Sequence, residues 1–170
     1  MYPGTHAQTR PDHPAAVFPA SGEVLTYRAL DAASIRLARV LRAAGLRTGD
    51  HVALLCGNGP AFLVATWACL RAGFYLTPLN WHLSAAEAAY VVDDCDARAL
   101  VASAAIEFAA EVGRLTPGCA VKLALDGAIP GFADGDAAMA AQSAAPLEDE
   151  TLGAMMNYSS APTQRRATRR

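Results

Sequence analysis

The amino-acid sequence predicts an α/β fold built on a parallel β-sheet, and three observations lead to this fold class. Short, continuously apolar runs alternate with longer segments in which apolar residues recur at helical spacing. The runs lack the polar alternation of a one-sided sheet, as residues 52–56 (Val-Ala-Leu-Leu-Cys) illustrate, so helices are expected to cover both faces. The two kinds of segment follow a β-α-β-α-β-α-β-α-β order, which favours parallel strands joined by right-handed crossovers.

The strands are expected where short apolar runs are bounded by turn-forming residues. They are residues 16–18, 24–26, 51–56, 75–78, 99–102, 121–125 and 152–158. We interpret the last of them as a buried strand, because Leu152 to Met156 are almost all apolar.

The first two helices have recognisable ends. One covers residues 31–44 and ends at Gly45, which suits the left-handed conformation that stops a helix. For the next, Asn58 is expected to be the N-cap, Pro60 to lie in the first turn and Gly73 to follow the end. The apolar stripe of the first helix consists of Ile35, Ala38, Leu41 and Ala44. The opposite side carries Arg36, Arg39 and Arg42.

Two further helices and one irregular region complete the expected order. Residues 84–87 (Ser-Ala-Ala-Glu) form a capping box that opens a helix ending near Asp94. A fourth helix is expected over residues 104–115. Residues 127–150 show no sustained periodicity and are interpreted as a surface connection with one helical turn near 137–142.

Length and charge limit the possible functions. The chain has 170 residues, 53% apolar and 18% charged, which suits one domain with a core. Its net charge of −2 combines +4 from the arginines of residues 161–170 with −6 elsewhere. Nucleic acid is not an expected partner, because a nucleic-acid surface needs a basic stripe across the folded body.

The cysteines and the apolar runs indicate the compartment. Cys56, Cys69, Cys95 and Cys119 lie far apart without metal-ligand spacing, so no metal site is expected and a reduced, cytoplasmic setting fits best. No secretory signal is visible at the N-terminus. The longest apolar run, residues 62–70, is about half the roughly twenty residues that a spanning helix needs, so no membrane span is expected.

Several candidate sites are better explained as structure, and no catalytic residue is assigned. Residues 57–62 (Gly-Asn-Gly-Pro-Ala-Phe) lack the third glycine of a dinucleotide-binding loop and are interpreted as a strand-to-helix turn. His51 begins a strand and has no nucleophile placed beside it. The acidic residues interpreted as exposed turn or helix-surface positions are Asp93, Asp94, Asp96, Glu107 and Glu111.

Ser159 and Ser160 are the candidate cofactor-binding residues. They follow the last expected strand through Tyr158. Hydroxyl groups and free backbone amides placed just after a buried strand can hold phosphate oxygens. A Ser-Ser pair alone is common, so its value as evidence for a phosphate site depends on what else the chain resembles.

Three ordered segments resemble the first motifs of the AMP-forming acyl-CoA synthetase and adenylate-forming ligase family. They are residues 25–30 (Leu-Thr-Tyr-Arg-Ala-Leu), 70–80 (Leu-Arg-Ala-Gly-Phe-Tyr-Leu-Thr-Pro-Leu-Asn) and 158–160 (Tyr-Ser-Ser). The resemblance covers residues 1–160, which it identifies as the family's N-terminal AMP-binding-type α/β subdomain. It leaves residues 161–170 as an aberrant, arginine-rich tail.

The resemblance implies a two-step reaction that uses ATP, Mg²⁺ and coenzyme A. A carboxylate attacks the α-phosphate of ATP, pyrophosphate leaves, and the thiol of coenzyme A captures the acyl-adenylate. Residues 2–7 and 80–83 look most like the fatty-acyl branch, so the carboxylic acid is expected to be a fatty acid. Only the possible phosphate contacts of Ser159 and Ser160 carry over to this chain.

The phosphate loop departs from the family pattern directly after Ser160. Ala161 replaces a glycine, Pro162 removes a backbone donor, and no lysine follows. We therefore expect a truncated fragment that binds no cofactor productively and is inactive alone. One hypothesis is a shifted reading frame, because one choice of codons for 161–170, read after one extra G, gives Gly-Thr-Asp-Ala-Ala-Ala-Gly-Asp-Pro-Lys.

Two alternatives remain open from the sequence. One is a non-catalytic α/β module that pairs with another ligase or a partner protein. A subdomain without its neighbour exposes apolar surface, so self-association is also expected. The other is a nucleotide-binding α/β protein unrelated to ligases.

Overall fold

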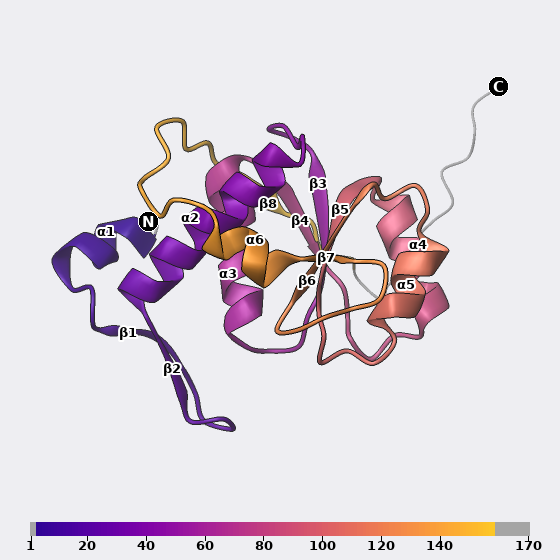
Figure 1. Ribbon diagram of the computed structural model, residues 1–170, viewed down its shortest axis with the longest axis horizontal. Helices are drawn as coiled ribbons and strands as arrows, with labels where there is room; N and C mark the ends of the chain where they lie inside the picture. The colour runs from indigo at the N-terminus through magenta and orange to yellow at the C-terminus, as the bar shows by residue number, and fades with distance from the viewer. Residues whose placement is uncertain (1–2, 159–170) are drawn as a thin grey trace.

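The predicted parallel sheet is the centre of the computed structural model, which describes residues 3–158. Six strands pair in parallel in the order β7-β6-β5-β3-β4-β8 (Figure 1). Their bounds are β3 His51–Leu55, β4 Tyr75–Pro78, β5 Ala97–Ser103, β6 Val121–Leu125, β7 Ala133–Asp134 and β8 Ala154–Met155. The α/β fold class predicted from the sequence is therefore confirmed.

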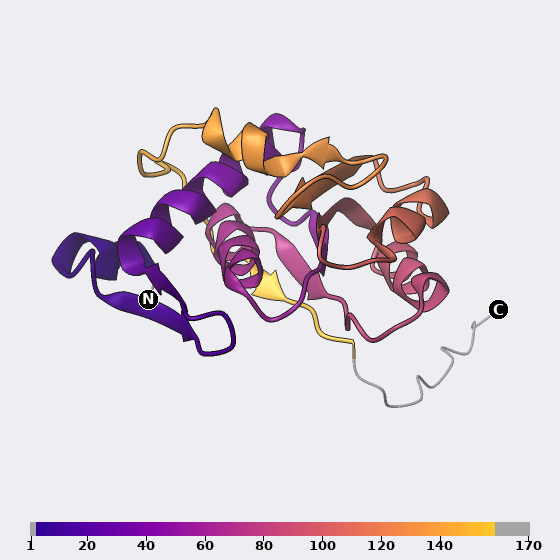
Figure 2. The same ribbon diagram turned by 60° about the horizontal axis from the view of Figure 1, so that its bottom comes forward.

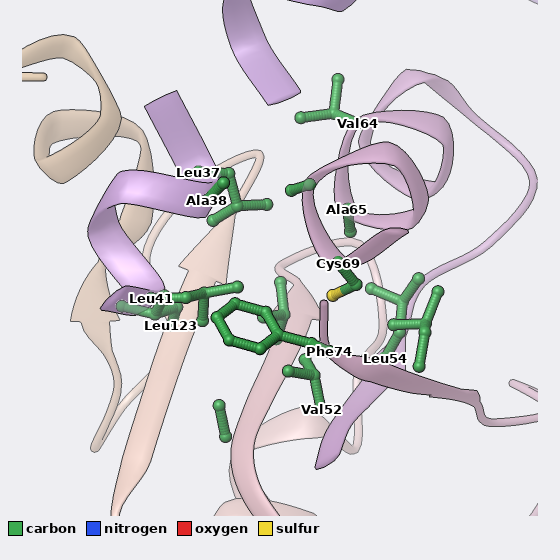
Figure 3. Packing of buried hydrophobic residues seen from close by; sticks show 14 of the residues in the cluster. Leu37, Ala38, Leu41, Val52, Leu54, Val64, Ala65, Cys69, Phe74 and Leu123 are labelled. Carbon is green, nitrogen blue, oxygen red and sulfur yellow. The ribbon is translucent and has the colours of Figure 1, made fainter. Parts of the chain in front are cut away.

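Helices cover both faces of the sheet, as the uninterrupted apolar runs predict. Successive residues of β3 supply opposite faces: Val52 and Leu54 join one core cluster, Ala53 and Leu55 the other. The first cluster packs against α2 (Tyr27–Ala43), α3 (Pro60–Ala72) and α6 (Gly135–Ala140), and the second against α4 (Ala85–Asp94) and α5 (Ala109–Leu115) (Figure 2). In the first cluster, Phe74 points toward Leu41 and Leu123 (Figure 3).

The first two predicted strands do not belong to the parallel sheet. β1 (Pro14–Phe18) and β2 (Glu23–Thr26) form a separate antiparallel hairpin that projects from the body (Figures 1 and 2). Only residues 19–22 connect them, which is too short for a parallel crossover. An additional short helix, α1 (Pro3–Thr9), precedes the hairpin and was not predicted.

The structure confirms most of the predicted helix starts and stops. α2 begins earlier than expected because the Thr26 side chain accepts a hydrogen bond from the Ala29 amide at 3.2 Å. Its predicted stop, Gly45, has φ +97°, whereas Ala44 is exposed rather than part of the buried stripe. At α3, Pro60 lies in the first turn and Gly73 follows the end, as predicted, and Gly73 is left-handed.

Two cap and boundary predictions need correction. Gly59, not Asn58, is the N-cap of α3, and no side chain caps it. α5 begins at Ala109 instead of residue 104, because the Ala104 amide still donates to Leu125 O of β6 at 2.8 Å. The capping box of α4 is confirmed: the Ser84 amide donates to Glu87 Oε2 at 2.9 Å.

The chain between residues 127 and 150 is more regular than predicted. It contains the edge strand β7 and then α6, which the Asp134 side chain caps by accepting from the Ala137 amide at 2.9 Å. α6 overlaps the expected helical turn near 137–142. Within the part of the chain that the structure describes, every helix is too short or too polar to cross a lipid bilayer.

The last predicted strand is shorter and more exposed than expected. Only Ala154–Met155 pair with β4, at the edge of the sheet. Leu152 is 77% exposed and Met155 40% exposed, so this is not a buried strand. The apolar run misled because an edge strand has a neighbouring strand on one side only, so its side chains are covered only in part.

Candidate functional site

The candidate site begins where β8 leads toward the carboxyl edge of the sheet. β8 runs parallel to β4, with Tyr75 opposite Ala154 and Leu76 opposite Met155. The Met156 amide donates to Leu76 O at 2.7 Å and continues the ladder. In open parallel sheets ligands bind outside the carboxyl ends of the strands, so the direction of β8 suits a phosphate-binding turn after it.

Gly153 allows β8 to approach the end of α3 closely. Its amide donates to Leu70 O at 2.8 Å. A Cβ at this position would lie 2.7 Å from Cys69 O and nearer still to Phe74 O. Only glycine therefore fits here without moving the backbone.

Arg71 anchors the segment that precedes β8. Its side chain is buried, and its guanidinium forms ion pairs with Asp31 at 2.6 Å and Glu150 at 3.1 Å. It also donates to Ser34 Oγ at 3.1 Å. A buried guanidinium needs such partners, so α2, α3 and the chain entering β8 are held together at this point.

Arg39 and Arg42 hold residues 145–149 against α2. Arg39 donates to Ala145 O at 3.0 Å, and Arg42 pairs with Asp149 at 2.7 Å. The sequence predicted these arginines on the helix face away from the core. They do lie there, but they are half-buried beneath this segment rather than free in solvent.

Tyr158 is tied to the last turn of α4. Its hydroxyl donates to Asp94 Oδ2 at 2.6 Å, and Tyr90 donates to Oδ1 at 3.4 Å. Burial raises the pKa of the Tyr158 hydroxyl, and the Asp94 carboxylate raises it further. The predicted cofactor-binding residues, Ser159 and Ser160, follow directly and lie outside the described residues.

The glycine-rich segment after β3 is a strand-to-helix turn, as predicted from the sequence. Residues 57–59 join β3 to α3 and, with Ser103 and Asp126, line a hollow of about 170 Å³. Ser103 donates to Asp126 at 2.7 Å, so these two polar groups satisfy each other. The arrangement is a strand-to-helix turn beside a small surface hollow.

The remaining singled-out residues have structural surroundings. His51 begins β3, and its ring packs against Tyr75 with centroids 5.0 Å apart. Glu107 and Glu111 were expected on one solvated helix face. Glu107 lies before the start of α5, so the two residues do not share a helix face. All four cysteines are buried free thiols, and burial raises their pKa values, to about 12 for Cys56 and about 11 for Cys119.

Sequence reasoning missed Arg71, Gly153 and Asp94 as determinants of this site. Two signals were available: an arginine inside the most apolar helix, and an isolated glycine inside an apolar run, which often marks close backbone approach. The role of Asp94 depends on a contact across 64 residues, which no local pattern reveals.

With this geometry described, comparison with known proteins decides the family. The model of the family described as AMP-binding enzyme matches residues 4–163. The chain belongs to this family. The match includes β8 and reaches past Ser160, so the resemblance seen in the three sequence motifs is confirmed.

The relatives of this chain include ligases that are much longer. A fatty acid–[acyl-carrier-protein] ligase, ScoC of Streptomyces coeruleorubidus, is 38% identical over 56% of this chain and 18% of its own length. A feruloyl-CoA synthase of an Amycolatopsis species is 44% identical over 47% of this chain and 16% of its own. The chain thus spans less than a fifth of these relatives.

A solved structure shares the fold. The anthranilate CoA ligase AuaEII, solved with anthranoyl-AMP, superposes with a TM-score of 0.79 over 93% of this chain and 30% of its own. The sequence identity is 19%, so this likeness concerns the arrangement of the elements alone.

Proposed function

We propose that this chain is the N-terminal part of an ATP-dependent, AMP-forming acyl-CoA synthetase that activates a fatty acid through an acyl-adenylate. The observation that carries the proposal is β8, an edge strand parallel to β4 that leads into Tyr158, Ser159 and Ser160 in a chain of the AMP-binding enzyme family. The name of ScoC supports a fatty acid as substrate, and that of the feruloyl-CoA synthase provides the competing class of acid.

The chemistry requires stabilisation of the triphosphate. A carboxylate is a poor electrophile, and its conversion to a mixed anhydride with AMP gives it a good leaving group. ATP, Mg²⁺ and coenzyme A are the cofactors of this proposed reaction. Within this chain, Ser159 and Ser160 would hold phosphate oxygens through their hydroxyl groups and backbone amides.

The residues present fit this role only in part. Two serines supply donors, but Ala161 and Pro162 follow them, and Lys122, the chain's one lysine, lies on β6 away from β8. The Tyr158 hydroxyl donates to the Asp94 carboxylate, whose charge repels a triphosphate. We infer that the 170-residue chain neither binds ATP productively nor activates an acid by itself.

A chimera tests the proposed function directly. Residues 1–160 of this chain replace the matching part of ScoC, whose own sequence resumes after the serines. We expect fatty-acid-dependent consumption of ATP, with a preference for a fatty acid over ferulate. A folded chimera without acid-dependent turnover would contradict the proposal.

Serine variants of the same chimera test the two site residues. Ser159→Ala with Ser160→Ala removes two donors to the phosphates and is expected to lower kcat about 100-fold. Ser21→Ala, in the exposed turn of the hairpin, is the matched control and should leave kcat unchanged. Equal activity of all three chimeras would exclude a role for the serines.

A further inference from the structure

We propose that the hollow at the carboxyl ends of β3, β5 and β6 binds a neutral ring that carries neighbouring hydroxyl groups, such as ribose. The hollow has a volume of about 170 Å³, and its polar side chains are those of Asn58, Ser103 and Asp126. Its lining includes no residue of β8, so the inference does not depend on the phosphate turn of the proposed function.

The hollow lies where the order of the strands in the sheet reverses. The chain passes from β3 to β4 on one side of β3, whereas it passes from β5 to β6 on the other side. The connecting helices α3 and α5 accordingly pack on opposite faces of the sheet. In open parallel sheets, two such neighbouring strands leave a crevice outside their carboxyl ends, and ligands bind there. Gly57 follows β3 and Ser103 ends β5, so the hollow occupies this crevice.

The two glycines of the hollow leave room beside the backbone. A Cβ at Gly57 or at Gly59 would have no neighbouring atom within 4 Å. Neither glycine has a left-handed φ, which the chain reserves for other glycines. Within the described residues, neither backbone conformation nor packing therefore requires glycine at these two positions. Glycine here keeps space open for a group that approaches the backbone closely.

Asp126 supplies a hydrogen-bond acceptor at this position. Its φ of +60° is left-handed, an uncommon conformation for a residue other than glycine. The Asp136 carboxylate holds this conformation by accepting from the backbone amides of Asp126 and Gly127. Ser103 donates to Oδ2 of Asp126 at 2.7 Å. Among residues 3–158, no group donates a hydrogen bond to Oδ1, so this oxygen is free to accept from a ligand.

The charges and the size of the hollow select a neutral ring with hydroxyl groups. The carboxylates of Asp126 and Asp136 lie close together and repel a phosphate or a carboxylate. The exposed Asn58 amide can both donate and accept, and Asp126 can only accept. Two neighbouring hydroxyl groups satisfy both residues, since each hydroxyl donates and accepts. The volume equals that of about five waters at about 30 Å³ each, which suits one sugar ring rather than a whole nucleotide.

Titration of the 170-residue chain with ribose tests the site. Amide signals are followed by NMR, and we expect saturable shifts at residues 57–59, 103 and 126. Half-saturation is expected at about 1–10 mM, because so few atoms contribute to binding. 2-Deoxyribose lacks one of the neighbouring hydroxyl groups and should bind about tenfold more weakly. Adenosine distinguishes the source of the ring: tighter binding than ribose points to a nucleoside, and weaker binding to a free sugar.

Two variants separate the site from the fold. Asp126→Asn keeps a residue type that tolerates left-handed φ, and it should weaken ribose binding about tenfold by removing the charged acceptor. Asp96→Asn is its matched control, since Asp96 is also left-handed, with φ +53°, but does not line the hollow. Gly57→Ala adds a methyl group that meets no protein atom within 4 Å. It should leave urea unfolding unchanged and abolish the ribose shifts.

The results decide the proposal whatever the outcome for ligase activity. Saturable ribose shifts that Asp126→Asn weakens and Asp96→Asn leaves unchanged would support it, even if the ScoC chimera is inactive. Absence of these shifts at ribose concentrations far above the expected half-saturation would overturn it. Stronger shifts at the same residues with inorganic phosphate than with ribose would also overturn it, because the hollow would then favour an anion.

Discussion

At the scale of single residues, one buried cation and one glycine determine how the chain enters β8. Arg71 is 1% exposed, and its partners Asp31 and Glu150 come from segments more than a hundred residues apart. Gly153 lies against backbone atoms of the α3–β4 junction. Both residues set the position of β8, the strand that precedes Ser159 and Ser160 in the sequence.

Arg71→Ala is expected to destabilise the fold by about 3 kcal/mol, because it leaves two carboxylates at the edge of the core without their cation. The free energy of unfolding from urea titration gives the value. Arg98→Ala removes the ion pair that the exposed Arg98 forms with the half-buried Asp50 at 3.5 Å, and it should cost less than about 1 kcal/mol. Equal losses in the two variants would contradict the anchoring role of Arg71.

Gly153→Ala is expected to cost about 1–3 kcal/mol, because the added methyl group cannot fit against Phe74 O and Cys69 O without moving backbone. Gly118→Ala is the matched control, since nothing lies within 4 Å of a Cβ there. Urea unfolding of both variants measures the difference. A stable Gly153→Ala chain would show that β8 does not approach α3 as described.

At the scale of elements, the sequence predicted those that local physics determines. The capping box of α4 was visible because both of its partners lie within four residues. β1 and β2 were assigned correctly as strands but to the wrong sheet, because pairing depends on connection length and not on composition. β8 was predicted too long, since an apolar run does not distinguish an edge strand from a central one.

The capping box gives a prediction about pH. The amide and hydroxyl of Ser84 donate to Glu87 and lower the pKa of its carboxyl from 4.5. The folded state is therefore favoured by this group above pH 4.5, and the contribution is lost as pH falls through the lowered pKa. In Ser84→Ala the Glu87 pKa, measured by carboxyl NMR titration, should rise toward its ordinary value; no change would contradict the capping interaction.

At the scale of the whole molecule, the fold and the family are established, and the serines proposed to bind phosphate lie outside the described residues. Helices cover both faces of the parallel sheet, and β8 lies at one edge of it. Ser159 and Ser160 follow β8 in the sequence. The sequence could indicate those serines by resemblance. It could not indicate the Arg71 ion pairs or the Tyr158–Asp94 contact, because these arise only when distant segments pack.

No observation on the described residues favours the alternative of a non-catalytic interaction module. A chain can have the fold of these ligases without having ligase activity. Adenylation needs a cation and backbone donors around the triphosphate. Residues 161–170 contain four arginines but neither the glycine nor the lysine of the family loop.

Acid-dependent exchange of labelled pyrophosphate into ATP by the purified 170-residue chain tests the central claim most directly. ScoC, with a fatty acid that it activates and Mg²⁺, serves as the positive control. We predict that the chain, correctly folded by its β6 amide protection, gives no exchange above the rate without acid. Robust exchange that depends on a carboxylic acid would contradict the account.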